Sequence, residues 1–287
     1  MHSANVKKSS WIGNGYDSWP DEILARQFDT LLIDEPAPDV LRVMFNRPEA
    51  SNSFNTVTCR ELFDVFGPLE IVRKRFRCVV LTGVGDKAFC AGGDLKERKT
   101  LDEEEWMLQH ELMERTVRAI VNCPVPIVAA INGAAYGGGL ELALLSDFAY
   151  ASTAARFALT EVSLGIMPGA GGTQNLARAV GERRAKELIL AAKPFSAQEA
   201  LAWGVVNQLC EPDVLMQDVL AIASRIAGNA PIAVRQAKHA IHQGMQADLA
   251  TGMLFEIEAY QRMVKTRDRQ EGVAAFNEKR KPQFEGR

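Results

Sequence analysis

The chain has 287 residues, of which 47% are hydrophobic and 24% are charged, and its formal net charge is −3. These values are typical of a globular protein built around one large domain, and they give no global electrostatic reason to expect nucleic acid or an anionic membrane surface as a partner. Its five scattered cysteines form no CxxC pair, which indicates neither a disulfide framework nor a zinc site and is typical of a reducing compartment.

Residues 1–28 are polar and are interrupted by Gly, Pro and Ser, so we expect a partly ordered N-terminal lead-in. This segment lacks the apolar core of a secretory signal. No apolar run elsewhere approaches the roughly 20 residues that a helix needs to span a bilayer. We therefore expect a cytoplasmic protein whose partner is a small molecule.

Predicted strands and helices alternate through residues 29–212, which predicts a core of the α/β class. The assignment rests on short apolar runs for strands and on helical spacing of apolar residues for helices. The predicted elements are strands at 30–35 and 41–45, a helix at 56–74, a strand at 78–83, a helix at 102–122, a strand at 125–135, a helix after the following glycines, and strands at 148–152 and 156–160.

Residues 213–287 have a different pattern, because helix-forming residues with helical spacing continue almost without a break. Pro212, Gly228, Pro231 and Gly244 stand where helices are expected to stop and start. We predict an entirely helical C-terminal region.

Two glycine-rich turns follow predicted strands and lead into predicted helices. One contains Gly137–Gly139, and the other contains Gly92 and Gly93 before Asp94, a residue type that caps helices. A helix N-terminus presents unpaired N–H groups, and glycine lets a ligand approach that backbone closely. The two turns could therefore bring two donors to one oxygen, although each could equally serve close strand–helix packing.

Two glutamates follow glycines or a predicted strand in the same part of the chain. Glu141 lies in the first turn of an apolar helix, where it could complement the helix dipole on a solvated face. Its apolar neighbours favour burial instead, which raises a carboxyl pKa towards the range useful for acid–base catalysis. Glu161 precedes the glycine-rich turn 169–172, and its alternative role is a structural hydrogen bond in a loop.

Five segments carry a resemblance to a known family. They are FNRPEASNSFN (45–55), AFCAGGDLKE (88–97), IVAAINGAAYGGGLELALLSDF (127–148), FALTEVSLGIMPGAGGTQ (157–174) and EGVAAFNEKRKPQF (271–284). In combination they resemble the crotonase, or enoyl-CoA hydratase/isomerase, superfamily, from about Leu32 to the C-terminus. The first segment departs mildly from the family pattern at Ser53-Phe54, where Ala followed by Leu or Met is usual, so the local packing is expected to differ there.

This resemblance implies a crotonase-like spiral of ββα units over residues 29–212 and a helical trimerisation region over 213–287, commonly assembled as a dimer of trimers. It places the two oxyanion-hole amides on Gly93 and Gly138 and the two hydratase glutamates on Glu141 and Glu161. Family members that isomerise rather than hydrate generally keep the second carboxylate and lack the first. The resemblance therefore implies an enoyl-CoA hydratase, a lyase of acyl-CoA metabolism.

The same resemblance implies positions that bind the CoA part of the substrate. They are Arg47, Ala91, Asp94, Lys96, Gly169 and, from a neighbouring subunit, Phe276 and Lys279. The lysines could instead lie on an ordinary solvated helix face. No metal and no cofactor is implied, because coenzyme A is part of the substrate. The four histidines lie outside these motifs.

Two alternative functions stay open at this point. An isomerase, racemase or dehydratase acting on acyl-CoA can share the fold, because a fold does not fix a reaction. A hydratase of this family that acts on methylglutaconyl-CoA also binds AU-rich RNA, and the basic run VRKRFR (72–77) is the candidate for such a role here. A short basic run is more often a solvated helix end that complements the dipole.

Overall fold

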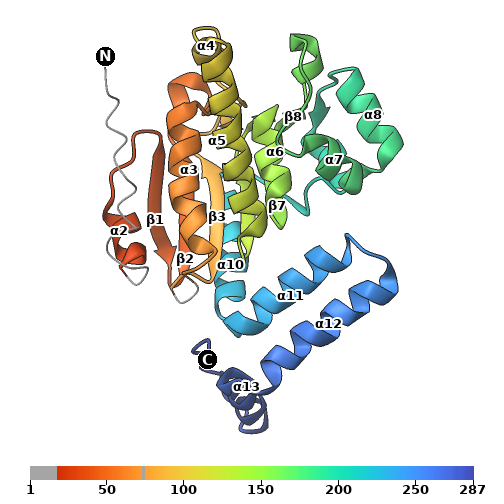
Figure 1. The fold of residues 1–287 in the computed structure, drawn as a ribbon. Coiled ribbons are helices and arrows are strands. Elements are labelled where there is room, and N and C mark those ends of the chain that lie inside the picture. Colours follow the sequence, from red (N-terminus) through yellow and green to blue (C-terminus); the bar gives the residue numbers. More distant parts are fainter. Residues whose placement is uncertain (1–17, 73–74) are drawn as a thin grey trace.

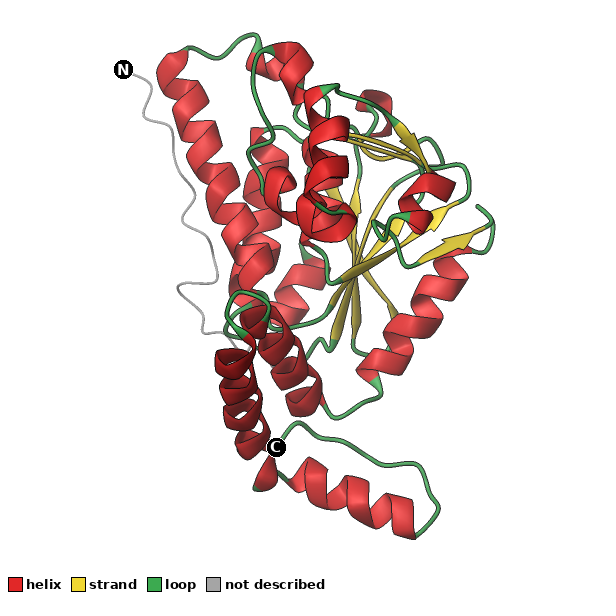
Figure 2. Cartoon of the chain, turned by 90° about the vertical axis from the view of Figure 1, so that its right-hand side faces the viewer, coloured by secondary structure: helices red, strands yellow, loops and turns green. Residues whose placement is uncertain are grey.

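Two β-sheets form the centre of the chain, and helices surround them (Figures 1 and 2). This computed structural model describes residues 18–72 and 75–287. The predicted α/β core and helical C-terminal region are both present. In spatial order the larger sheet contains β1 (Leu31–Ala37), β2 (Val40–Phe45), β3 (Cys78–Gly83), β5 (Ile127–Ile131), β7 (Phe148–Ser152) and β10 (Gln208–Cys210). The smaller sheet contains β4 (Ala88–Cys90), β6 (Ala134–Tyr136), β8 (Arg156–Ala158) and β9 (Phe195–Ser196).

Successive strands enter the two sheets in turn, so that β3, β5 and β7 lie in the larger sheet and β4, β6 and β8 lie in the smaller one. Pairing is parallel throughout β2-β3-β5-β7-β10 and β4-β6-β8, while β1 with β2 and β8 with β9 are antiparallel. Each passage of the chain therefore adds one strand to each sheet, which is the arrangement of a spiral.

The predicted strand at 125–135 is wrong in one respect, because the structure divides it between the two sheets. Asn132 ends the first part, and its Nδ2 donates to the carbonyl oxygens of Gly83 at 3.0 Å and Gly85 at 2.7 Å. A Cβ on Gly133 would lie 2.4 Å from the carbonyl carbon of Lys87. This close approach of two backbones turns the chain from one sheet to the other, and apolar periodicity does not reveal it.

The central strands β3 and β5 of the larger sheet are buried on both faces, which explains their continuous apolar sequences. Val79 and Leu81 of β3 belong to the same apolar cluster as Leu62 of helix α3 (Thr56–Leu69). Cys78 and Val80 belong to a second cluster. That cluster contains side chains of α10 (Leu215–Ala227), so α3 and its neighbour α5 (Glu103–Asn122) cover one face and α10 covers the other (Figure 1).

Side-chain caps fix several helix starts. Asn55 accepts from the Thr58 amide at α3, and Asp102 accepts from the Glu105 amide at α5, each in a reciprocal capping box. Helix α3 ends at Leu69, earlier than the predicted Lys74 and one residue after Pro68. The remaining short helices of the core are α4 (Leu95–Arg98), α6 (Gly138–Leu145), α7 (Gly172–Val180), α8 (Glu182–Leu190), α9 (Ala197–Ala202), and the 3-10 helices η1 (Pro48–Ala50) and η2 (Glu161–Leu164).

The last three helices extend away from the sheets (Figure 1). They are α11 (Pro231–Gly244), α12 (Leu249–Val264) and α13 (Arg267–Asn277). The helix ends predicted at Gly228, Pro231 and Gly244 are confirmed. Helices α11 and α12 pack on each other, and the hairpin is tied to the core by an ion pair of 2.7 Å between Lys238 and Asp147.

The part of the predicted lead-in that the structure describes contains helix α2 (Trp19–Ala25). Trp19 and Ile23 are buried, and the Trp19 ring meets the ring of Phe76 edge-on with a centroid distance of 6.1 Å. All five cysteines are buried and unpaired. Over residues 18–72 and 75–287, no helix combines the length and apolarity needed to cross a membrane.

Candidate active site

The glycine turn 137–139 packs closely against Glu161, Phe54 and Cys90. Gly137 has φ = 52°, and a Cβ on it would lie 3.2 Å from Glu161 Oε1. A Cβ on Gly138 would lie 2.6 Å from the ring of Phe54, and one on Gly139 would lie 2.0 Å from the carbonyl oxygen of Cys90. There is therefore little room for a side chain at residues 137–139, and the backbone at the start of α6 packs directly against its neighbours. The Gly138 amide is one of the N–H groups that a helix start leaves without an internal partner.

The second glycine turn, at the end of β4, lies against the first. The Phe54 amide donates to the Gly92 carbonyl, and the Asp94 amide donates to the Phe54 carbonyl, both at 2.9 Å. Among the described residues, no backbone oxygen accepts from the Gly93 amide between them. A Cβ on Gly92, which has φ = 91°, would lie 3.2 Å from the Gly138 nitrogen. The two turns thus bring the amides of Gly93 and Gly138 into one neighbourhood.

Glu141 is held in place by the start of another helix. It lies in the first turn of α6 with 3% of its surface exposed. Its Oε1 accepts from the amides of Ala170 and Gly172, both at 2.8 Å, while Oε2 lies 3.8 Å from the position of a Cβ on Gly138. Burial raises the pKa of Glu141, and the Gly172 and Ala170 amides oppose that effect. One oxygen is fixed, and the other faces the glycine turn.

Glu161 has the opposite environment. It is the first residue of η2, it is 9% exposed, and neither of its carboxylate oxygens has a hydrogen-bond partner among the described residues. Burial raises the pKa of Glu161 to about 7, the nearby charge of Glu141 acts in the same direction, and Arg98 opposes it. A carboxyl group of this kind can exchange a proton near neutral pH.

Both glutamates and both glycine turns line one cavity of about 220 Å³. Residues of α4 and α5 that sequence analysis did not single out form another wall. They are Leu95, Arg98, Trp106, Gln109, His110 and Met113. His110 therefore lies in the site although no motif contains it. Sequence patterns predict a helix in this segment, but they do not say which of its faces meets the glycines.

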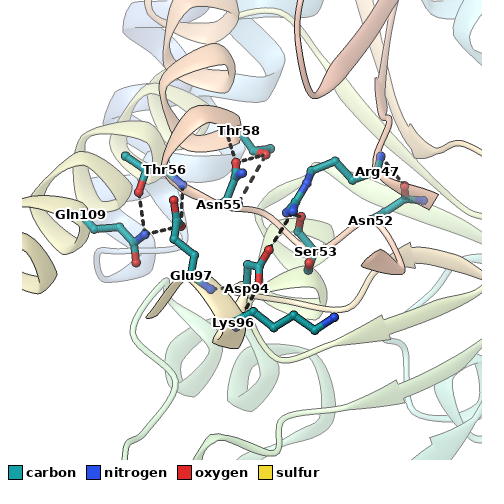
Figure 3. Close-up of polar contacts among 10 residues, drawn as sticks. All are labelled: Arg47, Asn52, Ser53, Asn55, Thr56, Thr58, Asp94, Lys96, Glu97 and Gln109. Carbon is teal, nitrogen blue, oxygen red and sulfur yellow. Dashed lines mark hydrogen bonds and ion pairs between the residues drawn. The ribbon is translucent and has the colours of Figure 1, made fainter. Parts of the chain in front are cut away.

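The predicted CoA-binding residues Arg47 and Asp94 interact with each other (Figure 3). Their ion pair is 2.8 Å long, Arg47 also donates to the Ser53 carbonyl, and Asp94 accepts from the amides of Lys96 and Glu97 as the cap of α4. The Arg47 guanidinium and the amides of α4 hold the pKa of Asp94 below its usual value, although burial opposes them. These contacts tie the 47–53 turn to the Gly93 turn.

The remaining predicted CoA-binding residues fall into two groups. Ala91 and Gly169 line the cavity, and Lys96 is exposed on α4. Phe276 lies in α13 and is 84% exposed, and Lys279 follows just after that helix. Helices α13 and α4 lie at opposite ends of the molecule (Figure 1). Neither residue lines the cavity of its own chain.

The basic run at 72–77 is only partly described, because Arg73 and Lys74 lie outside the described residues. Arg75 pairs with Glu35 and Asp39, and Arg77 pairs with Asp39 at 3.3 Å. These two arginines are therefore engaged in the fold. In the described ranges no group of three or more His, Cys, Asp or Glu side chains is arranged to hold a metal ion.

Known proteins share this sequence and fold. Residues 36–287 match the family described as enoyl-CoA hydratase/isomerase. The chain is 42% identical over 250 residues to the short-chain-enoyl-CoA hydratase of Clostridium acetobutylicum, covering 87% of this chain and 95% of that protein. It is 38% identical over 258 residues to the mitochondrial methylglutaconyl-CoA hydratase of Rattus norvegicus, covering 88% and 82%. A crystal structure of enoyl-CoA hydratase from Bacillus anthracis superposes with a TM-score of 0.88 at 43% identity, covering 90% of this chain and all of that one.

Proposed function

The chain belongs to the enoyl-CoA hydratase/isomerase family, and from this premise we propose that it adds water across the C2=C3 double bond of a 2-enoyl-CoA thioester. The observation that carries the proposal is the pair of buried glutamates on one cavity. Glu141 is held by two amides, and neither carboxylate oxygen of Glu161 has a hydrogen-bond partner in the part of the chain that the structure describes. An isomerisation needs one carboxylate to move a proton, whereas hydration must also orient a water molecule.

The two amides have a role at the thioester oxygen. Attack of water at C3 moves electrons through the double bond and builds negative charge on that oxygen. The amides of Gly93 and Gly138 would donate to it. One donor in a comparable site lowers the activation barrier by roughly 3 kcal/mol. Because these donors are backbone groups of neighbouring turns, they need no rearrangement as the charge develops.

The two carboxylates divide the remaining work. Glu141, with Oε1 fixed by Ala170 and Gly172, holds the water at C3 through its other oxygen. Glu161, whose pKa is about 7, exchanges protons with the water and with C2. Overall the water gives its hydroxyl to C3 and a proton to C2. No cofactor besides the coenzyme A of the substrate enters this reaction.

A spectrophotometric assay of purified protein tests the proposal. Crotonyl-CoA and a branched 2-enoyl-CoA should lose the absorbance of the conjugated enoyl thioester as water adds, and the product should be the 3-hydroxyacyl-CoA. Conversion of a 3-enoyl-CoA to its 2-enoyl isomer, without hydration of either substrate, would contradict the proposal and identify an isomerase.

We also propose that the chain forms a homo-oligomer through α11 and α12, with further copies covering an apolar face. The large apolar side chains exposed there include Ile241, Met245, Leu249, Met253, Leu254 and Tyr260. A monomer seldom leaves so many apolar residues exposed on two neighbouring helices. In such an assembly Phe276 and Lys279 of one copy would reach the CoA of another. Light scattering should give a trimer or a multiple of it, and a monomeric mass would refute this proposal.

A further inference from the structure

Phe54 lies where the sequence departs from the family pattern, and in the structure it contacts both glycine turns. Its amide donates to the Gly92 carbonyl and its carbonyl accepts from the Asp94 amide, both at 2.9 Å, so its backbone pairs with the turn that carries Gly93. Its ring, which is 5% exposed, lies against Gly138 of the other turn. One residue therefore joins the two amides that are proposed to hold the thioester oxygen.

The far edge of the Phe54 ring makes the contact with Gly138. The ring atoms Cζ and Cε1 lie 2.6 and 2.7 Å from the position of a Cβ on Gly138. Among the described residues, the next atom beyond the backbone of α6 is Glu141 Oε2, at 3.8 Å. The ring edge thus fills the place that a side chain at position 138 would take. A leucine ends at Cδ, before the positions of Cζ and Cε1, so it would leave this place open.

The backbone that carries the ring is held on both sides of Phe54. The Ser53 carbonyl accepts from Arg47 Nη1 at 2.7 Å, and the Thr56 amide donates to Glu97 Oε2 at 2.9 Å (Figure 3). A displacement of the opposite glycine turn towards the ring would therefore have to move this whole segment. The ring acts as a fixed stop, because close-packed interiors transmit such displacements instead of absorbing them.

The separation of the two amides decides whether they can work together. An oxyanion is stabilised when both donors lie about 2.7–3.1 Å from it, and a misplacement of about 1 Å can cost about 100-fold in rate. We propose that Phe54 is a positioning residue whose ring edge sets the distance between the amides of Gly93 and Gly138, so that both donate to one thioester oxygen. This inference rests on the proposed function, in which these amides hold that oxygen.

A single substitution tests the role of the ring edge. Phe54→Leu introduces a residue type that the family usually has at this position, and it removes the two ring atoms that meet Gly138. We expect kcat for crotonyl-CoA to fall about 10-fold, which is part of the loss that follows removal of a whole oxyanion donor. The affinity for butanoyl-CoA, measured by calorimetry, should change by less than about 2-fold, because this saturated thioester develops no oxyanion.

Two further variants serve as controls. Phe66→Leu makes the same change at a buried phenyl group of α3 that does not line the cavity, and it should leave kcat unchanged. Phe54→Met restores an unbranched side chain that is long enough to reach Gly138, so its kcat should lie between those of Phe54→Leu and wild type. Circular dichroism and Tm would verify folding. If Phe54→Leu did not fold, Phe54→Met would take its place in each comparison.

A double variant tests the contact itself. Gly138→Ala adds a methyl group where the ring edge lies, and Phe54→Leu makes room for that methyl group. The factor by which Gly138→Ala lowers kcat should therefore be at least about 3-fold smaller in Phe54→Leu than in the wild-type background, as expected for residues in contact.

An infrared measurement reports on the amides directly. Hydrogen bonds to a thioester carbonyl lower its stretching frequency, and an isotope label at the carbonyl carbon of butanoyl-CoA identifies this band. Binding to wild-type protein should lower the frequency. In Phe54→Leu the band should lie closer to that of free butanoyl-CoA, whereas in Phe66→Leu it should match wild type. A purely structural role of Phe54 would not move this band.

The outcomes separate this inference from the proposed function. An unchanged kcat in Phe54→Leu, an equal loss in Phe66→Leu, or the same factor lost to Gly138→Ala in both backgrounds would overturn the positioning role and leave the hydratase proposal standing. Absence of hydration by wild-type protein would overturn the hydratase proposal instead. The carbonyl band would then still decide the role of Phe54, because it needs no turnover; the same band in wild type and Phe54→Leu would overturn that role.

Discussion

Two walls of the same cavity are built in different ways. One consists of backbone turns and two glutamate carboxylates, and residues 137–139 at the start of α6 carry no side chains of their own. The other consists of long side chains on α4 and α5, in which Arg98 lies between Trp106 and Gln109. The first wall places backbone amides and carboxylates at fixed positions. The second wall consists of side chains, so a substitution there would change the shape and polarity of the cavity. The difference separates the reaction from the choice of substrate.

The largest effect should come from Glu161. Replacing it with Gln keeps the shape of the first wall and removes its proton carrier, so we expect kcat to fall about 10³-fold. Isothermal calorimetry with a saturated acyl-CoA should show little change in affinity, because the lost group acts on the reacting atoms. Glu141→Gln should behave similarly. Full activity in either variant would break the comparison, because the first wall would then not carry the reaction.

A smaller effect is expected at the glycine turn. In Gly138→Ala the new methyl group would lie 2.6 Å from the Phe54 ring, so the buried ring and the turn must move apart, and any shift of the turn displaces its amide. We expect kcat to fall about 100-fold, near the loss of one oxyanion donor. The matched control is Gly67→Ala in α3, where a Cβ would make an ordinary contact of 3.7 Å with Phe63. Equal activity in the two variants would show that the turn is only a packing device.

The second wall should respond in specificity instead of rate. Trp106→Leu removes the aromatic face under Arg98, and a cation–aromatic contact at a partly exposed site contributes about 0.5–1 kcal/mol. We therefore expect the kcat/KM values for crotonyl-CoA and for a branched 2-enoyl-CoA to change by different factors, so that their ratio shifts about 2- to 5-fold. A loss of kcat comparable to that of Glu161→Gln, on both substrates, would place Trp106 with the first wall.

The smallest effect concerns stability. Burial raises the pKa of Glu161 from 4.5 to about 7, so the folded protein binds its proton more tightly than the unfolded chain does. Stability from this group is present below pH 4.5 and is lost as pH rises through 7. Glu161→Gln removes that loss, which amounts to about 1–2 kcal/mol after allowance for partial exposure.

Differential scanning calorimetry of the same pair checks the sign. The Tm of Glu161→Gln should exceed that of wild type by a few degrees at pH 8.5, and the gap should shrink towards pH 5. A gap that widens at low pH would show that Glu161 is stabilised as a carboxylate in the folded protein, which would contradict its unpartnered environment. The first wall would then lose the feature that makes it reactive.

The residues that make up the first wall could be named from the sequence for a physical reason, whereas their catalytic roles remain predictions. Gly137–Gly139 and Glu141 belong to the first turn of one helix, so their positions in the sequence determine that they lie close together in space. The α/β core and the helical C-terminal region followed from apolar periodicity in the same way. The CoA-binding roles of Arg47 and Asp94 remain predictions. What the structure shows is an ion pair between their side chains.

The individual contacts of the second wall could not be predicted, because they form only when side chains of α4 and α5 pack on each other. Arg98 and Gln109 are 11 residues apart in the sequence. Their hydrogen bond depends on the Glu97 carboxylate, which accepts from the Gln109 side-chain amide and thereby orients it. The division of the strand at Asn132 was hidden for a similar reason. It is caused by contacts with residues 83–88, which lie about fifty positions earlier in the chain. Periodicity reports which residues are buried, and not what they meet.

The two carboxylates are carried by separate elements, α6 and η2, and this separation bears on how such a site can evolve. A single codon change at Glu141 leaves the other carboxylate, its helix and the glycine turns in place. It also frees the amides of Ala170 and Gly172, which now hold Glu141 Oε1, to face whatever enters the cavity. A substitution at this one position can therefore change which groups the cavity presents without rebuilding the fold.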